Sequence, residues 1–265
     1  DYVFRIILGD LMQRSALYTL IILLSFIFSQ SNLGKGKLFY DNREQGRDEL
    51  VASTKSIDEA IRIFEVEVSD DPESKEAIEY LLKSYYYRAE YATTNIEEQK
   101  TFFDKGKSLG LDYINKYPDS IEFRYWYLAN LGGWAKVYGI LTAAREGVAD
   151  QMKEHAEKII EMDSSYKNGG GYYLLGAVHF KSPYIPFLLS WPDNDDAIKF
   201  LTLAVETGNA ELNQLHYLAQ ALHKDGQVNK AKELLNRVIN TEPNFENLIE
   251  DLNYIQEAKD LLKDM

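Results

Sequence analysis

The sequence predicts an all-α fold, a stack of helix pairs of the kind called an α-solenoid, and three observations support this prediction. The first is a set of apolar residues that returns after 34 positions: Ala197, Leu201 and Ala204 recur as Ala231, Leu235 and Val238. The second is an amphipathic stretch between the two copies, at 215–223, whose apolar residues share one helical face. The third is Pro243, which ends the second copy. The repeating unit is therefore helix, short turn, helix, and the chain has room for about four to five such pairs.

Weaker copies of this unit precede the clear ones. Ala60 and Pro72 keep the interval of 12 residues that separates Ala231 from Pro243, which predicts the second helix of a pair at 59–68. A first helix is expected at 38–53, after a short Gly- and Lys-rich linker at 32–37.

The middle of the chain supplies two further pairs. One is expected at 75–91 and 96–117, where Gly106 is the small residue that admits the neighbouring helix and Pro118 ends the pair. The next is expected at 120–137 and about 150–162. The passage at 138–148 is too long for a compact turn, so we expect a short extra helix there.

The next pair carries an insertion. Gly176 and Ala197 lie 21 residues apart, whereas the equivalent Ala219 and Ala231 lie 12 apart, so nine residues have been added in the segment Lys181–Pro192. Insertions in repeat arrays map to one surface and often serve binding. A final amphipathic helix at 245–262 is expected to cap the open apolar face of the last pair.

Charge and composition exclude several classes of protein. The net charge is −13, with 42 acidic and 29 basic residues, which argues against a nucleic-acid partner because phosphate backbones are held mainly by Lys and Arg. There are no cysteines, so the chain has no disulfide, no thiolate metal site and no lipid-modified cysteine.

The first 31 residues have the pattern of an export signal. Arg14 precedes an apolar run of about a dozen residues at 17–28, and the small residues Ser29 and Ser31 follow at the expected cleavage point. We therefore predict an upstream extension and signal peptide at 1–31, a TPR-like helical domain at 38–265, and export, in a bacterium to the periplasm. If the signal is not cleaved, it anchors the chain in a membrane.

The repeat resembles the tetratricopeptide repeat (TPR) family across about residues 55–243. The resemblance is carried by the small residues Ala60, Gly106, Ala197 and Ala231, by the pair Leu175 and Gly176, and by the closing Pro72, Pro118 and Pro243. More narrowly, the aromatic segment 125–132, the segment 169–176 and the Pro-containing insertion are similar to the T-component (TatT-like) proteins associated with TRAP transporters. That resemblance implies an exported protein that works with a periplasmic solute-binding subunit.

The first helices of such pairs form a concave surface, and by register with Leu175 and Gly176 they supply the candidate binding residues. With one residue of the insertion, these are Tyr86, Tyr87, Trp126, Asn130, Trp134, Tyr173, Phe180, Trp191, His216, Gln220 and His223. Aromatic rings with a few amides suit a peptide, a helix or an apolar ligand. The alternative for Trp126, Trp134 and Tyr173 is packing between repeats.

No catalytic signature is present. His216 and His223 share a helical face, with His179 as a nearby third histidine, but a zinc site needs a third ligand at ligand spacing and none is evident. The sequence has no GxSxG, HExxH, P-loop or GxGxxG before a helix. We therefore predict a protein that is not an enzyme and uses no metal or cofactor.

Two functions remain open from sequence alone. The first is a protein-interaction module, an accessory subunit that engages the solute-binding protein of a TRAP-type transporter. The second is a carrier that encloses an apolar small molecule or lipid in a pocket between the repeats. A third hypothesis, a helical hydrolase, is supported only by acidic residues to which no catalytic role can be assigned. The sequence leaves the oligomeric state undetermined.

Overall fold

The computed structural model describes residues 32–187 and 189–265, and within these ranges it contains twelve α-helices, one short 3₁₀-helix and no strand. The signal segment therefore lies outside the described residues. The elements are α2 (Asn32–Asp41), α3 (Thr54–Asp70), α4 (Lys75–Tyr91), α5 (Ile96–Lys116), α6 (Ile121–Tyr138), α7 (Ile140–Arg145), α8 (Val148–Met162), α9 (Tyr166–Lys181), α10 (Asn194–Thr207), α11 (Leu212–Lys224), α12 (Val228–Asn240), η1 (Phe245–Asn247) and α13 (Leu248–Lys263).

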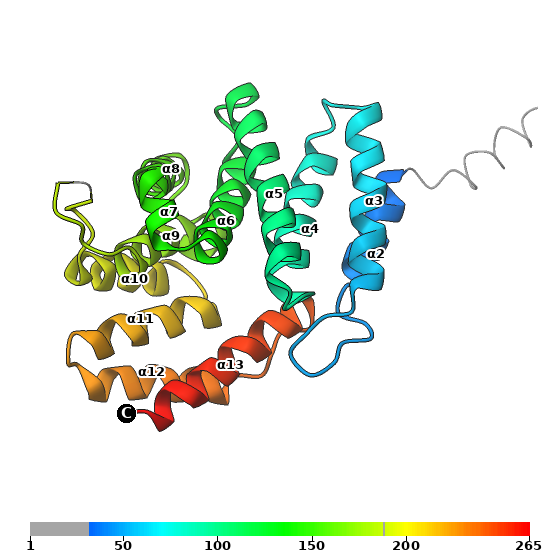
Figure 1. Ribbon diagram of the computed structural model, residues 1–265. Coiled ribbons are helices and arrows are strands. Elements are labelled where there is room, and N and C mark those ends of the chain that lie inside the picture. Colours follow the sequence, from blue (N-terminus) through cyan, green and yellow to red (C-terminus); the bar gives the residue numbers. More distant parts are fainter. Residues whose placement is uncertain (1–31, 188) are drawn as a thin grey trace, which may run out of the picture.

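The helices pair along the chain as α2 with α3, α4 with α5, α6 with α8, α9 with α10, and α11 with α12 (Figure 1). This confirms the predicted all-α solenoid. The short helix expected at 138–148 is α7, and the insertion is the connection between α9 and α10. The first helix was misplaced: residues 32–37, expected as a linker, belong to α2, which ends at Asp41, and 42–53 form a turn segment. Gly36 lies in this helix at a point where the ring of Phe64 packs directly against the backbone, so a larger residue would not fit.

Side-chain caps define where several helices start. The side chains of Ser53, Asn95, Ser120 and Asp193 accept hydrogen bonds from the first free N–H groups of α3, α5, α6 and α10. Glu211 and Gln214 form a reciprocal capping box at α11. Asp193 is therefore a helix cap, which matches the preference for an acid at a helix start.

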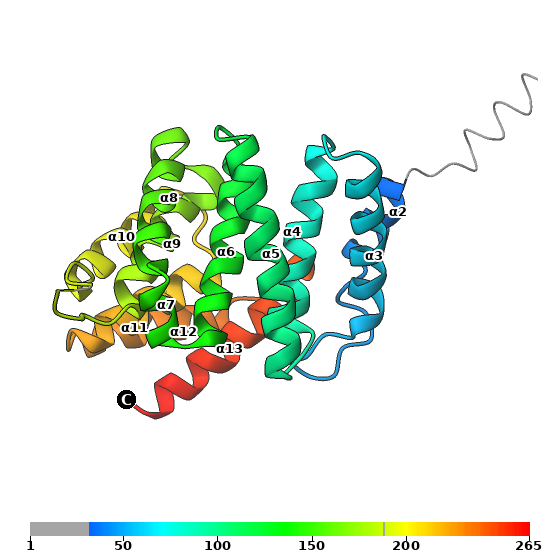
Figure 2. The same cartoon turned by 45° about the horizontal axis from the view of Figure 1, so that its top comes forward.

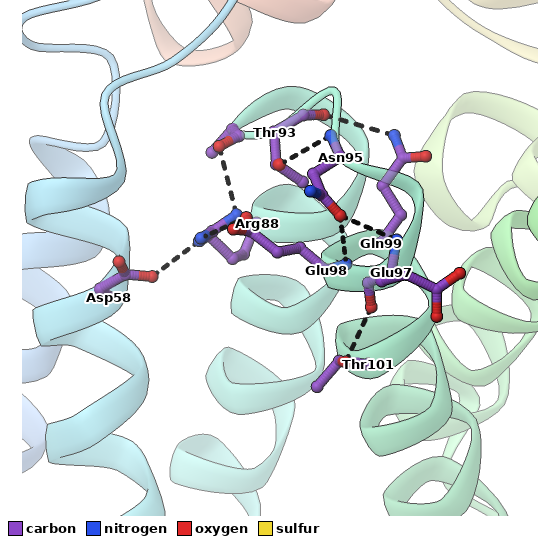
Figure 3. A network of polar contacts seen from close by, with 9 residues as sticks. Asp58, Arg88, Thr93, Asn95, Glu97, Glu98, Gln99 and Thr101 are labelled. Carbon is purple, nitrogen blue, oxygen red and sulfur yellow. Dashed lines mark hydrogen bonds and ion pairs between the residues drawn. The ribbon is translucent and has the colours of Figure 1, made fainter.

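A buried arginine joins three consecutive helices. Arg88, on α4, is 7% exposed and donates to Asp58 of α3 at 2.7 Å and to Glu98 of α5 at 3.0 Å, as Figure 3 shows. It also donates to the carbonyl of Ala92 at the end of its own helix. Around this centre, Asn95 caps α5 and Thr93 closes the turn between α4 and α5 (Figure 3).

Glycines set how closely neighbouring helices approach. A Cβ on Gly106 would lie 2.0 Å from the Asn130 side chain, and one on Gly133 would lie 2.1 Å from the Phe103 ring. The role predicted for Gly106 in admitting the neighbouring helix is therefore confirmed, and Gly176 has the same role, since a Cβ there would lie 2.6 Å from Leu201.

The C-terminal helix does more than the expected cap. Ile255 and Ala258 of α13 pack with Leu235 and Val238 of α12, as a cap requires. However, α13 also runs away from α12 to the turn segment after α2, a path visible in both Figure 1 and Figure 2. There Ile249 is fully buried in a cluster formed with residues of α3 and α4, and Asn253 donates to the carbonyl of Leu50 at 3.1 Å. The two ends of the solenoid are thereby joined.

Within the described ranges, no helix combines the length and the apolar character that crossing a membrane requires.

Adjacent glycines on α6 provide a matched test of the helix contact. We expect Gly133→Ala to lower the free energy of unfolding by about 1–3 kcal/mol, because the methyl group overpacks against Phe103. Gly132→Ala is the control, since its Cβ would meet only the flexible end of Met152 at 3.5 Å, and we expect it to stabilise by up to about 1 kcal/mol through helix propensity. Urea denaturation of both variants measures the difference, and equal stabilities would contradict the close packing.

Candidate functional site

The inner face of the solenoid is formed by the first helices of the pairs, and α13 lies across it. Tyr254 of α13 contacts the ring of His216 on α11 with centroids 5.6 Å apart. On the helices behind it, Tyr173 meets Tyr217 at 5.3 Å and Tyr86 meets Trp126 at 6.0 Å. Aromatic side chains from α4, α6, α9, α11 and α13 thus line one interior.

A groove opens along this interior between α9, α11 and the second half of α13. It has a volume of about 410 Å³ and is lined by Phe180, His216, Gln220, His223, Lys224, Glu257, Asp260 and Leu261. Phe180 and Leu261 supply apolar surface, and charges of both signs surround it. His223 has a buried Nδ1 with no hydrogen-bonding partner among the described residues. The groove is therefore amphipathic.

The imidazole of His216 is neutral at pH 7. It is 1% exposed, and burial first, then the nearby charge of Lys181, lowers its pKa to about 4. Its Nδ1 lies 3.4 Å from a carboxylate oxygen of Glu257, but with a neutral ring this contact is a dipolar one and not an ion pair. Gln220 connects the site to the start of the insertion, because Lys181 Nζ donates to its Oε1 at 3.0 Å.

Four of the predicted binding residues, Phe180, His216, Gln220 and His223, meet in this groove. Three others, Tyr86, Trp126 and Tyr173, are partly buried and lie further along the inner face. Of these seven residues, four line the groove and three lie outside it.

Three predicted residues lie instead in the core. Tyr87 is 5% exposed and packs under the guanidinium of Arg43. Asn130 is fully buried, and its amide donates to the carbonyls of Leu82 and Trp126. Trp134 is 6% exposed, stacks on Tyr138 and donates from Nε1 to Asp104 at 2.8 Å. Each is turned away from the inner face by its position on the helix, so the expected groove position was wrong for all three.

Trp191 also has a different place from the one expected. Its Nε1 donates to Asp150 of α8 at 2.7 Å, and its ring lies 4.8 Å from that of His179. These contacts fix the base of the insertion against α8 and α9. The exposed aromatic residues of the insertion are Tyr184, at 63%, and Phe187, which is fully exposed and has a φ of 65°.

The three histidines considered as metal ligands do not converge. His179 is buried against Trp191 and Phe200 and does not join His216 and His223. Among the described residues, no three His, Cys, Asp or Glu side chains converge as metal ligands would.

Sequence reasoning missed the contribution of α13. Glu257, Asp260 and Leu261 complete the groove, and Glu250, which is half-buried, lies on the first half of the same helix. Burial, helped by the charges of Glu211 and Asp251, raises the pKa of Glu250 to about 7, against the opposing charges of Lys167 and Arg43. The negative charge of Glu250 also raises the pKa values of Tyr86 and Tyr91 on α4 and of Tyr125 on α6, although burial is the larger cause for each. One carboxyl group therefore acts electrostatically on side chains of two first helices.

The raised pKa of Glu250 predicts a specific pH dependence of stability. Because the folded state holds this proton more tightly than the unfolded chain, stability is lost as pH rises from the ordinary value of 4.5 through about 7. Glu250→Gln should therefore unfold at higher denaturant concentration than the natural chain at pH 8, with no such difference at pH 4.5. Denaturation at both values measures this, and Glu242→Gln, an exposed acid after α12, is the control. A Glu250→Gln variant less stable than the natural chain at pH 8 would contradict it.

The fold has a counterpart among solved structures. The structure of TTC0263, a thermophilic TPR protein from Thermus thermophilus, is similar to this chain with a TM-score of 0.56, covering 79% of this chain and 92% of that one. The sequence identity is 13%, so the likeness concerns the fold. No family model matches the sequence, and no curated protein matches it. The chain therefore has a TPR-like all-α solenoid fold, and its narrower similarity to T-component proteins stays a prediction.

Proposed function

We propose that this chain is a protein-interaction module, not an enzyme, and that it binds a segment of its partner in the groove between α9, α11 and α13. The observation that carries the proposal is the composition of this groove. Apolar Phe180 and Leu261 lie beside Gln220 and His223, with Lys224 and Asp260 as charges of opposite sign. A peptide segment presents the matching set, because its backbone donates and accepts hydrogen bonds while its side chains supply apolar and charged groups.

The insertion supplies a second contact region close to the groove. Lys181, where α9 ends, lies over the rings of Phe180 and Tyr217 and binds Gln220. From this base the chain extends to the exposed rings of Tyr184 and Phe187. A bulky residue with positive φ is strained, and such strain is concentrated at functional sites. We assign Phe187 as a contact that a partner protein covers.

The partner we propose is the periplasmic solute-binding subunit of a TRAP-type transporter. Two features support this choice: the export-type segment at 1–31 and the resemblance of segments 125–132 and 169–176 to T-component proteins. In this proposal the chain is exported and acts in the periplasm as an accessory subunit.

The interior gives less support to a lipid carrier. Tyr86, Tyr125, Tyr173 and Tyr254 bring phenolic hydroxyl groups to the inner face, together with the carboxyl group of Glu250. Burying an acyl chain among such groups would leave their hydrogen bonds unsatisfied, which is unfavourable. A carrier of purely apolar molecules is therefore not the function that we propose.

Changing the groove should weaken partner binding without unfolding the chain. We expect Phe180→Ala with Gln220→Ala to raise the Kd for the purified solute-binding subunit by about tenfold or more, because buried aromatic anchors dominate interface energies. Biolayer interferometry gives the Kd, and circular dichroism confirms the helical content. Leu111→Ala, a 40%-exposed residue of α5, is the matched control.

The outcomes of this experiment separate the module from its proposed partner. Equal Kd values for the groove variant and the natural chain would remove the groove from consideration. If the solute-binding subunit does not bind at all, while another exported protein binds and loses affinity in the groove variant, the interaction module stands and the transporter assignment is wrong.

A further inference from the structure

The charges around the groove between α9, α11 and α13 are divided between the helices that form it. Lys224 lies in the last turn of α11, and Lys181 is the last residue of α9. The acids Glu257 and Asp260 both belong to α13. The side of the groove formed by α9 and α11 therefore carries positive charge, and the side formed by α13 carries negative charge.

Two of these four charged groups are already held by contacts within the chain. Lys181 Nζ donates to Oε1 of Gln220 at 3.0 Å. The carboxylate of Asp260 accepts from Lys263 and from Gln256, each at 2.9 Å. A bound segment would have to compete with these contacts, so Lys181 and Asp260 are the weaker candidates for recognising its charges.

The other two, Lys224 and Glu257, are available to a bound segment. Lys224 is exposed, and its ammonium group lies 5.4 Å from the ring centroid of Phe180. The side chain of Glu257 is 59% exposed, and its carboxylate approaches only the neutral ring of His216, at 3.4 Å. Within 32–187 and 189–265, neither residue forms an ion pair with a Lys, Arg, Asp or Glu side chain.

Exposed charges of this kind decide which segment fits more than how tightly it binds. Water solvates both groups well, so each attractive pair adds little affinity, whereas a like charge placed opposite either group is unfavourable. A wholly acidic segment is repelled by Glu257, and a wholly basic one by Lys224. A segment that carries one charge of each sign avoids both repulsions.

We propose that the groove takes a partner segment in which an apolar residue lies between one acidic and one basic side chain. Lys224 faces the acid, Glu257 faces the base, and the apolar residue packs against Phe180 and Leu261. The assignment rests on the proposed function, because it names the kind of segment that the groove of the interaction module binds. The two unlike charges also set the direction in which the segment lies.

Selection of phage-displayed random peptides on the full chain supplies the probe. Groove ligands are the selected peptides that lose affinity for the variant with Phe180→Ala and Gln220→Ala. We expect these ligands to be enriched in an apolar residue flanked by one acid and one base. The tightest is synthesised together with two neutralised forms, one with Gln in place of the acid and one with Gln in place of the base.

Fluorescence polarisation then measures Kd for each pairing of peptide and variant. Lys224→Gln should weaken the parent peptide by about three- to fivefold, as the loss of one exposed ion pair predicts, and should leave the peptide without the acid unaffected. Glu257→Gln should show the same relation to the base of the peptide. The controls are Lys199→Gln and Glu242→Gln, which remove exposed charges outside the groove and should change no Kd.

The results separate this inference from the function on which it rests. If groove ligands are selected but lack either charge, or if Lys224→Gln weakens the parent peptide and the peptide without the acid equally, the charge assignment is overturned while the groove remains a binding site. If no selected peptide loses affinity for the groove variant, the proposed function and the charge assignment both fail. High salt should reduce the effects of Lys224→Gln and Glu257→Gln on the parent peptide, because it screens exposed charges.

Discussion

The contact between α13 and the turn segment after α2 is the constraint on which the interior depends. Glu246 and Ile249 meet residues about two hundred positions earlier in the chain: Arg43 donates to the carbonyl of Glu246, and Glu44 accepts from the N–H of Ile249 at 3.1 Å. An open solenoid exposes its inner face to any partner that reaches it. Here the chain's own last helix lies over part of that face, and a groove opens beside its second half.

This closure explains the unusual chemistry of the inner residues. Tyr86, Tyr125 and Tyr173 come from three separate helices, yet each has a pKa raised by burial to well above 10, so each hydroxyl stays neutral and can donate or accept. Tyrosine offers a large apolar ring and one polar atom, which suits an interior that is enclosed but not dry. Phenylalanine would fill the same volume without the hydrogen bonds.

Much of the fold could be predicted from the sequence because it depends on contacts between residues that recur at short, regular intervals. The 34-residue return of Ala197 as Ala231 and the position of Gly176 reflect contacts between adjacent helices, and such contacts leave a regular trace in the sequence. The contact that closes the solenoid leaves no such trace, because Ile249 packs against residues of α3 and α4 that stand at no regular interval from it. An amphipathic pattern identifies α13 as a helix but not the two surfaces that it covers.

The site was predicted less completely, for a related reason. In the run of tyrosines at 85–87 each residue turns by about 100° from the last, so only Tyr86 faces the interior while Tyr87 packs beneath Arg43. The register from Leu175 and Gly176 selected residues of α9 and α11 that line the groove, whereas the residues that it selected on α6 include Asn130 and Trp134, which are buried. The left-handed backbone at the start of α9 could have been predicted in part, because Asn168 and Gly169 are residue types that favour this conformation.

Glu250 connects the closure with the interior that it encloses. The charge of Arg43, at the joined ends, and that of Lys167, at the start of α9, both lower its pKa, while burial and the neighbouring acids Glu211 and Asp251 raise it. The protonation of Glu250 therefore bears on the closure, since only its ionised form is attracted to Arg43. Because such effects are reciprocal, any change that displaces α13 would also alter the pKa of Glu250. The last helix is thus the element through which the groove and the closure of the solenoid influence one another.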